Sequence, residues 1–283
     1  MWETALAFAV WGCYGSVLTA ARIDPAITAI ARTVAVGVIL TVFVRSPVPW
    51  RSGALWLSGA VLLVDEVLYI VSAVSGPVAI IGLAYGCVPV VVPVISSFLQ
   101  TDARPLNWRR WLYLGLAFIG NLLIFRELRA AQIAFSTAAV FAAFAALLFC
   151  IMPLASSSLQ QQGLGAWAVL KGQGIVAAIL AVPLIVLLRA FGTFGSADGA
   201  MIARSAAMGS VNSIAFTIVP FYFWYRGIAR AGVSRTAVCC FAEPLVATMF
   251  SLFIVKDAPP TPVLLAGAGL VLAGIALSAR GEA

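Results

Sequence analysis

Apolar runs of similar length follow one another along the whole chain, separated by short segments that hold charged residues, Pro and Gly. A helix needs about 20 apolar residues to cross the hydrocarbon core of a bilayer. Cutting the chain at the polar segments predicts ten such helices, at 3–20, 27–44, 53–74, 78–99, 110–125, 135–158, 166–189, 205–225, 233–255 and 262–279. Nine is the main alternative, because the 126–136 region is ambiguous. The pattern predicts an all-α polytopic membrane protein.

One stretch of this pattern occurs twice, at an offset of 155 residues that relates Pro89 to Pro244. The other pairs at this offset are Val91 and Val246, Ser96 and Ser251, Phe98 and Phe253, Asp102-Ala103 and Asp257-Ala258, and Pro105 and Pro260. Such internal similarity indicates a duplicated unit. We therefore predict two five-helix repeats, 1–130 and 131–283. Because five is odd, the second repeat enters the bilayer inverted, as in many secondary transporters.

Composition agrees with a membrane protein, since 63% of the 283 residues are hydrophobic and only 10% are charged. A soluble domain is roughly half apolar and about a quarter charged. The start, Met1-Trp-Glu-Thr, lacks the positive region of a signal peptide, so the first run is expected to stay in the membrane.

The net charge of +7 comes from residues in short turns, not from a basic stripe, so we expect no nucleic-acid partner. With the N-terminus inside, the inner loops hold Arg45, Arg51, Arg104, Arg109, Arg110, Arg226, Arg230, Arg235 and Arg280. The outer loops then hold Arg22, Arg126, Arg129, Arg189, Arg204 and Lys256. This excess favours cytoplasmic termini by the positive-inside rule. The expected location is a bacterial inner membrane.

The chain has no histidine, and its five cysteines form no metal-like or redox spacing. The commonest general base and metal ligand are therefore absent. We predict no metal, no cofactor and no enzymatic activity. The expected partners are membrane lipid and a small-molecule substrate, with the protein either a monomer or a homodimer.

Ionisable residues inside membrane runs are costly and tend to face a cavity or each other. Arg32 and Lys171 fall at matching places in the second and seventh runs. They either bind substrate or serve as snorkelling or paired structural cations. Asp65 and Glu66 lie mid-run in the third helix, where Asp65, Tyr69 and Ser72 share one face. Glu66 either lies at the cavity edge or pairs with Arg32 or Lys171, and an unpaired carboxyl here could carry a proton.

Two prolines are expected to break matched helices, Pro89 in the fourth run and Pro244 in the ninth. Tyr85 shares a face with Pro89, and Glu243 precedes Pro244 where the first repeat has Val88. This difference makes Glu243 a prime site candidate.

Three further groups carry polar or aromatic character. The eighth run has a stripe of Ser210, Ser213, Thr217, Pro220 and Trp224, with Asn212 beside it. The stripe either lines the cavity or joins helices by hydrogen bonds. Trp11 and Tyr14 share a face mid-membrane and either wall a pocket or fill the core. The last run of each half carries glycines that suit close helix contact: Gly115, Gly120, Gly267, Gly269 and Gly274.

With these features the chain resembles the drug/metabolite transporter superfamily, EamA-type group. The resemblance rests on Trp11-Gly12 in the first helix, Arg32 in the second, and Pro89 and Glu243-Pro244 in the fourth and ninth. Gly115/Gly120 and Gly269/Gly274 match the Gly-rich helix that closes each half. The family's Gly-Glu turn is altered here to Thr101-Asp102 and Lys256-Asp257.

This resemblance implies an inner-membrane carrier that works by alternating access, with a cavity lined by the first, third, fourth, sixth, eighth and ninth helices. Cations and anions together suit a zwitterion, so we expect export or exchange of a small metabolite, with an amino acid as the expected substrate. The alternatives are a proton-coupled exporter of organic cations or drugs, in which Glu66 and Glu243 bind the cation, and a non-transporting membrane subunit.

Overall fold

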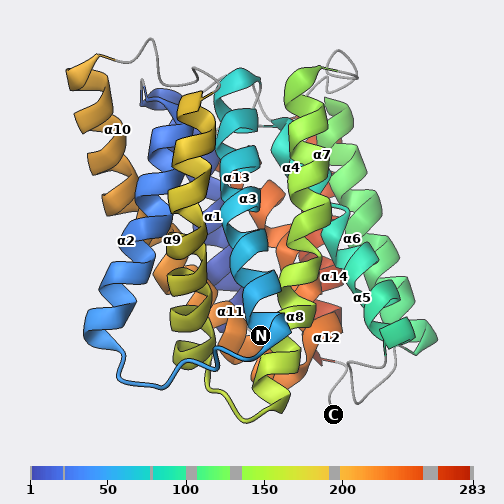
Figure 1. Cartoon of the computed structure of the whole chain (residues 1–283). Helices are drawn as coiled ribbons and strands as arrows, with labels where there is room; N and C mark the ends of the chain where they lie inside the picture. Colours follow the sequence, from blue (N-terminus) through green and yellow to red (C-terminus); the bar gives the residue numbers. More distant parts are fainter. Residues whose placement is uncertain are drawn as a thin grey trace.

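The computed structural model is a bundle of helices that run approximately parallel and antiparallel to one another (Figure 1). It describes residues 2–21, 23–76, 79–99, 107–127, 136–190, 198–250 and 261–280. The secondary structure of these ranges is helical, without strands. The beginning of the first helix and the end of the last lie toward the same end of the bundle, the lower end in Figure 1.

The helices of the first half are α1 (Trp2–Ala20), α2 (Pro25–Phe43), α3 (Gly53–Ser75), α4 (Ala79–Tyr85), α5 (Val88–Leu99) and α6 (Trp108–Glu127). Those of the second half are α7 (Thr137–Phe149), α8 (Ile151–Gln161), α9 (Ala166–Ala190), α10 (Gly199–Asn212), the π-helix η2 (Ser213–Ile218), α11 (Val219–Ala231), α12 (Val233–Ala237), the 3₁₀-helix η3 (Val238–Phe241), α13 (Ala242–Phe250) and α14 (Pro262–Arg280).

Six helical segments of the described chain are long and apolar enough to cross a membrane, counting α4 with α5, α7 with α8, and α10 with α11. They are 25–43, 53–75, 80–99, 137–161, 166–190 and 199–231, and shorter apolar helices cover 111–126 and 262–278. The all-helical class is therefore confirmed, and the length and apolar composition of these helices are consistent with a membrane protein. The largest difference from the predicted bounds is the eighth run, which extends at both ends to 199–231.

Helix starts follow the local sequence. Asp24 caps α2, because its Oδ1 accepts a 2.9 Å hydrogen bond from the Ile27 N–H and Pro25 occupies the first helical position. Ser136 caps α7 through the Ala139 N–H at 3.2 Å, and Asp198 caps α10 through the Met201 N–H at 2.7 Å. Each polar residue thus ends a connection and fixes where the next apolar run becomes helical.

The prolines chosen from the sequence lie directly after distorted backbone. A turn at Gly86–Cys87 separates α4 from α5, and Pro89 lies in the first turn of α5. The 3₁₀-helix η3 separates α12 from α13, and Pro244 lies in the first turn of α13. A proline removes one helical donor and crowds the preceding turn, which explains both positions. The acidic turns that follow, at 101–105 and 256–260, and Ser251 lie outside the described residues.

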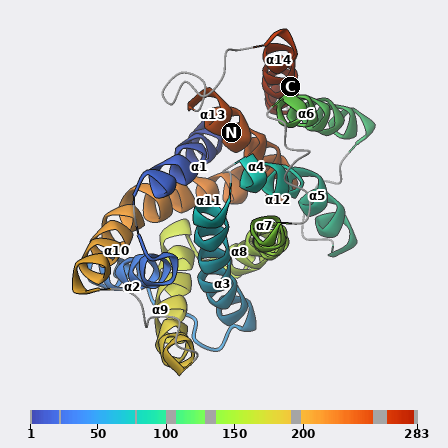
Figure 2. The ribbon, with the colours of Figure 1, turned by 90° about the horizontal axis from the view of Figure 1, so that it is seen from above.

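The packing divides the bundle into a central group and two edges. Figure 2 shows α6 beside α14 at one edge and α2, α9 and α10 at the opposite edge. A Cβ added to Gly120 would lie 2.6 Å from the Gly267 carbonyl oxygen, and one on Gly274 would lie 2.7 Å from the Ala117 Cβ. Gly120, Gly267 and Gly274 therefore permit close contact between α6 and α14. Gly115 and Gly269 have open space beside them and serve no such contact.

Candidate functional site

A narrow cavity lies in the middle of the bundle, between helices from both ends of the sequence. It is lined by Trp11, Tyr14, Arg32, Asp65, Glu66, Tyr69, Tyr85, Phe149, Phe221 and Glu243. The space open to a water molecule is only about 20 Å³. A cavity needs roughly 10–15 Å³, measured in the same way, to hold one water. In this conformation the side chains therefore close around room for about one water.

Each of the three guanidinium nitrogens of Arg32, on α2, donates a hydrogen bond. Its Nη1 donates to Glu66 Oε2 of α3 at 2.6 Å, its Nε donates to Thr217 Oγ1 at 2.5 Å, and its Nη2 donates to the Phe216 carbonyl at 2.6 Å. The guanidinium also lies 4.2 Å from the centre of the Tyr14 ring. Of the alternatives left open by the sequence, the internal ion pair of Arg32 with Glu66 is the one present.

The Phe216 carbonyl is available to Arg32 because of a proline. In a regular α-helix its donor would be the N–H of residue 220, but Pro220 has none. The backbone here is the π-helix η2, and two other helices supply donors instead. Arg32 Nη2 and Trp11 Nε1 both donate to this oxygen at 2.6 Å. The single oxygen thereby ties α1 and α2 to η2.

The other two carboxylates differ in their surroundings. Asp65 of α3 accepts a 2.6 Å hydrogen bond from the Tyr85 hydroxyl of α4. Glu243 of α13 is 96% buried, since only 4% of its surface is exposed. Among the described residues its carboxylate has neither a hydrogen-bond donor nor an ion-pair partner. An isolated buried charge is costly, so Glu243 is the side chain in this cavity most in need of a partner.

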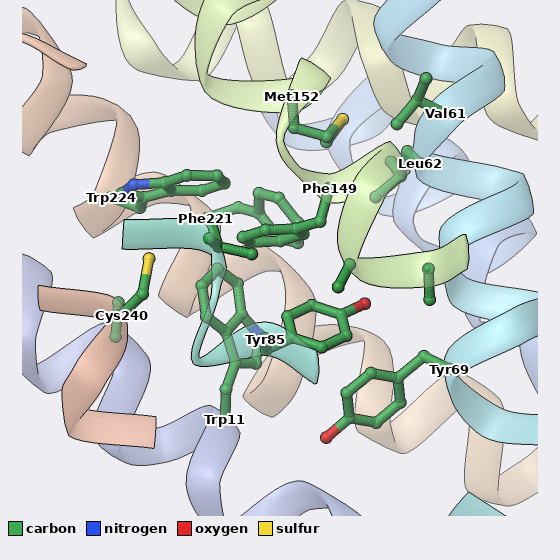
Figure 3. Close-up of a cluster of buried hydrophobic side chains, with 14 of the residues drawn as sticks. Trp11, Val61, Leu62, Tyr69, Tyr85, Phe149, Met152, Phe221, Trp224 and Cys240 are labelled. Atoms are coloured by element: carbon green, nitrogen blue, oxygen red, sulfur yellow. The ribbon is translucent and has the colours of Figure 1, made fainter. Parts of the chain in front are cut away.

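Aromatic rings form the remaining walls. Tyr14 stacks on Tyr69 with ring centres 5.5 Å apart, and Tyr69 meets Tyr85 edge to face at 5.6 Å. On the other side Trp11 contacts Phe221 at 4.8 Å. Figure 3 shows the rings of Trp11, Tyr69, Tyr85, Phe149 and Phe221 gathered close together. Stacked and perpendicular rings present both faces and edges to the cavity, which suits an organic cation or another ring.

Of the twelve cavity residues expected from the sequence, eight line this space together: Trp11, Tyr14, Arg32, Asp65, Glu66, Tyr69, Tyr85 and Glu243. Thr217 is not among the residues that line the cavity, but its hydroxyl accepts the hydrogen bond from Arg32 Nε. Trp224 packs against Phe149 with ring centres 4.9 Å apart and forms the layer behind the wall. Asn212 is buried in α10, where its amide nitrogen has no partner within the part of the chain described.

Lys171 is not part of the cavity. Its Nζ donates to the carbonyls of Val44 and Ser46, at 2.7 and 3.0 Å. The lysine therefore holds the chain just beyond the end of α2, because carbonyls after a helix end lack intrahelical donors. Although Lys171 and Arg32 occupy matching places in their runs, the two cations do not meet at one site. Of the roles expected for Lys171, the structure shows a structural one, in which it binds backbone carbonyls.

Two wall residues, Phe149 and Phe221, were absent from the prediction. Phe221 follows Thr217 by four residues, so the same helical stripe contained the signal. Phe149 carried no comparable signal, because it is an apolar ring within the apolar run 135–158. Pro220 indicated that the Phe216 carbonyl would lack its helical donor. It did not indicate which side chains would donate to that oxygen instead.

Metal binding finds no support in the geometry. Within the described residues, no three His, Cys, Asp or Glu side chains are placed to share one ion. The cavity lining combines carboxylates with aromatic rings.

Comparison with known proteins informs the fold alone. No family model matches the sequence, and no curated protein matches it. Among solved structures, a crystal structure described only as that of a protein aligns with 98% of this chain and 97% of its own, with a TM-score of 0.71 and 20% sequence identity. The nearly complete coverage of both chains shows that the whole helical architecture is a known fold.

Proposed function

We propose that the chain is a secondary transporter that moves a small organic cation, or a metabolite bearing an amine, by alternating access. The observation that carries this proposal is Glu243, a buried carboxylate in an aromatic cavity at the centre of the bundle, for which the described residues supply no hydrogen bond or ion pair. With Asp65 and Glu66 the cavity holds three carboxylates against Arg32 alone. A cationic ligand would satisfy the excess, and the rings would contact its apolar part.

An inverted two-fold repeat of five helices each, 1–130 and 131–283, is part of this proposal. It is supported by contacts between helices, because a helix pair that packs together has counterparts in the other repeat that also pack together. If α1 corresponds to α7–α8, α2 to α9, and α3 to α10–α11, then the packing of α2 on α10 matches that of α9 on α3. Likewise, α1 packs on α13 as α7 packs on α4, and α6 packs on its counterpart α14. Inverted repeats around a midplane site are typical of secondary transporters.

Orientation follows from the same proposal. The lower end in Figure 1 carries the connection after α2 with Arg45 and Arg51, and the α11–α12 junction with Arg230 and Arg235. Glu3 at the start of α1 joins this end, where it pairs with Arg226 and Arg230. The positive-inside rule makes this end cytoplasmic. An inner-membrane carrier of the drug/metabolite transporter type, as the sequence resemblance implies, would have this orientation and ten crossings.

Alternating access is supported by a second, larger hollow at the same end. It measures about 530 Å³ and is walled by the end of α8 and the α11–α12 junction, including Gln160, Arg230 and Ser234. Ser234 also meets Ser96 of α5 through a buried 2.9 Å hydrogen bond. We interpret this hollow as a cytoplasmic vestibule, with the α5–α12 contact closed above it and the central cavity occluded.

An amino-acid substrate is the second candidate. Its ammonium would meet Glu243, but its carboxylate needs a cation, and Arg32 is already bound to Glu66. Arg32 would have to exchange Glu66 for the substrate carboxylate. The geometry supports the cation more directly, because Glu243 has no hydrogen bond or ion pair to exchange among the described residues.

Flux into proteoliposomes separates the two candidates. Three labelled probes share one ring and differ in charge: phenethyltrimethylammonium, phenylalanine and 3-phenylpropionate. We expect uptake of the cation, loss of that uptake in Glu243→Gln, and retention in the control Glu3→Gln, whose carboxylate lies at the exposed end of α1. Uptake of phenylalanine in preference to the cation would favour the amino-acid candidate. Equal background flux of all three probes would reject both.

A further inference from the structure

A third hollow lies on the outside of the bundle, at the end of α2. It measures about 450 Å³, and its walls include Ile39 and Phe43 of α2, Trp167 of α9 and Ile218 of η2. Phe43 is 79% exposed beside it, so the hollow opens toward the lipid. Arg45, in the segment that follows α2, is the charged residue among those that line it in the described part of the chain.

The backbone on both sides of Arg45 is fixed. Val44 is extended, with φ −109° and ψ 113°, and Lys171 Nζ binds the carbonyls of Val44 and Ser46. The Lys171 ammonium group is thereby occupied by backbone carbonyls, and its hydrogen bonds fix the rim of the groove. Arg45 itself is left with no carboxylate partner among the residues described.

Aromatic residues place this rim at the level of lipid headgroups. Trp167 stacks on Tyr222 with ring centres 4.0 Å apart, and Arg226 lies 5.6 Å from the centre of the Tyr222 ring. Trp50 and Trp56, in the connection after α2 and the first turn of α3, are joined by a 2.9 Å hydrogen bond from the Trp56 indole. Trp and Tyr concentrate at the membrane–water interface, where arginines reach the anionic headgroups.

We propose that this groove binds one anionic phospholipid of the leaflet at the α2 C-terminal end, with an acyl chain along Ile39 and Ile218 and the phosphate at Arg45. The apolar walls match an acyl chain, and the unpaired arginine at the rim matches a negative headgroup. A free anion would leave the walls uncovered, and a zwitterionic lipid would bring an ammonium group to the same arginine. The site lies apart from the central cavity and stands whether or not the transport proposal holds.

Thermal unfolding in mild detergent tests this site with two lipids of identical acyl chains, phosphatidylglycerol and phosphatidylcholine. A ligand that binds only the folded state raises the unfolding temperature. We expect phosphatidylglycerol to raise Tm by about 3–5 °C and phosphatidylcholine to raise it by less than about 1 °C. Arg45→Gln should abolish the difference between the lipids. Arg51→Gln, an exposed arginine of the same connection outside the groove, should retain it.

Two further measurements distinguish binding of the whole lipid from binding of its headgroup alone. Deacylated phosphatidylglycerol, glycerophosphoglycerol, should give no shift at the same concentration. Ile39→Trp, which fills the groove and leaves Arg45 in place, should lose the phosphatidylglycerol shift, and Ile39→Phe serves if the larger side chain prevents folding. Equal losses in Arg45→Gln and Arg51→Gln would show a diffuse surface-charge effect and overturn the proposal. An unchanged shift in Arg45→Gln or in the filled groove would overturn it too.

Discussion

Arg32 and Glu66 form an ion pair of 2.6 Å in the centre of the bundle, with side chains only 2% and 7% exposed. The same chain contains a surface pair for comparison, because Arg230 and Glu3 lie 3.3 Å apart with side chains 63% and 35% exposed. A buried charge that loses its partner is far costlier than an exposed one, since water cannot replace the partner. The two pairs should therefore respond very differently to the same substitution.

Arg32→Gln is expected to lower the free energy of unfolding by about 3–5 kcal/mol, because it leaves Glu66 buried without a cation. Arg230→Gln should change it by less than about 1 kcal/mol. Denaturant unfolding in detergent micelles measures both. In the double variant Arg32→Gln/Glu66→Gln part of the loss should return. If the double variant lost the sum of the two single losses, the pair would not be coupled.

Removal of the Tyr85 hydroxyl tests the bond to Asp65. Tyr85→Phe keeps the ring between Tyr69 and Phe149 but removes the only hydrogen bond to the Asp65 carboxylate found among the described residues. Because hydrogen bonds to charged groups contribute about 1.5–3 kcal/mol, we expect a loss of that size. Tyr113→Phe on α6 is the matched control and should be neutral. A neutral Tyr85→Phe would indicate that Asp65 has another partner or is uncharged.

The α6–α14 contact can be tested with glycines of the same two helices. Gly120→Ala would place a Cβ 2.6 Å from the Gly267 carbonyl oxygen, so the helices must separate. We expect a loss of about 1–3 kcal/mol in the free energy of unfolding, as for other overpacked contacts. Gly115→Ala has open space and should be neutral or stabilise by up to about 1 kcal/mol, since Ala favours helix. Equal effects at both positions would contradict close packing at Gly120.

Trp11 is expected to contribute directly to binding of a cation. Trp11→Phe replaces the ring that attracts cations most strongly and removes the donor to the Phe216 carbonyl. Isothermal titration with phenethyltrimethylammonium should show an affinity about 5- to 30-fold weaker than that of the unaltered protein. Trp2→Phe, at an indole 89% exposed on the first turn of α1, should bind as tightly as the unaltered protein. Equal affinity of the two variants would remove Trp11 from the site.

Much of the site could be predicted from sequence because charge and aromatic residues are conspicuous in apolar helices. Asp65, Glu66 and Glu243 each interrupt a membrane-length run, and burying them is costly unless they meet in one place. The proline rule located the distorted backbone before Pro89 and Pro244 for a similar reason, since it depends on a missing donor and not on neighbours.

What sequence reasoning could not supply is which partner each cation takes. Arg32 and Lys171 occupy matching places in their runs, yet Arg32 turns to Glu66 and Lys171 to the carbonyls after α2. Both choices give the cation hydrogen-bond acceptors, and only the packing of α2 against α9 and η2 decides between them. Phe149 was missed for the same reason, because an apolar ring in an apolar run carries no mark of facing a cavity.

The two bonds received by the Phe216 carbonyl have a mechanical consequence. Pro220 cannot donate to the Phe216 carbonyl, and this oxygen instead receives two hydrogen bonds from other helices, which tie α1 and α2 to η2. Relative motion in this bundle is then left to the segments whose backbone is already interrupted. The Gly86–Cys87 turn and η3 are such interruptions, and they lie in helices that touch one another through Ser96 and Ser234. Under the proposed alternating access, we expect opening toward the larger hollow to be a hinge movement of α5 and α12 relative to α1, α2 and η2.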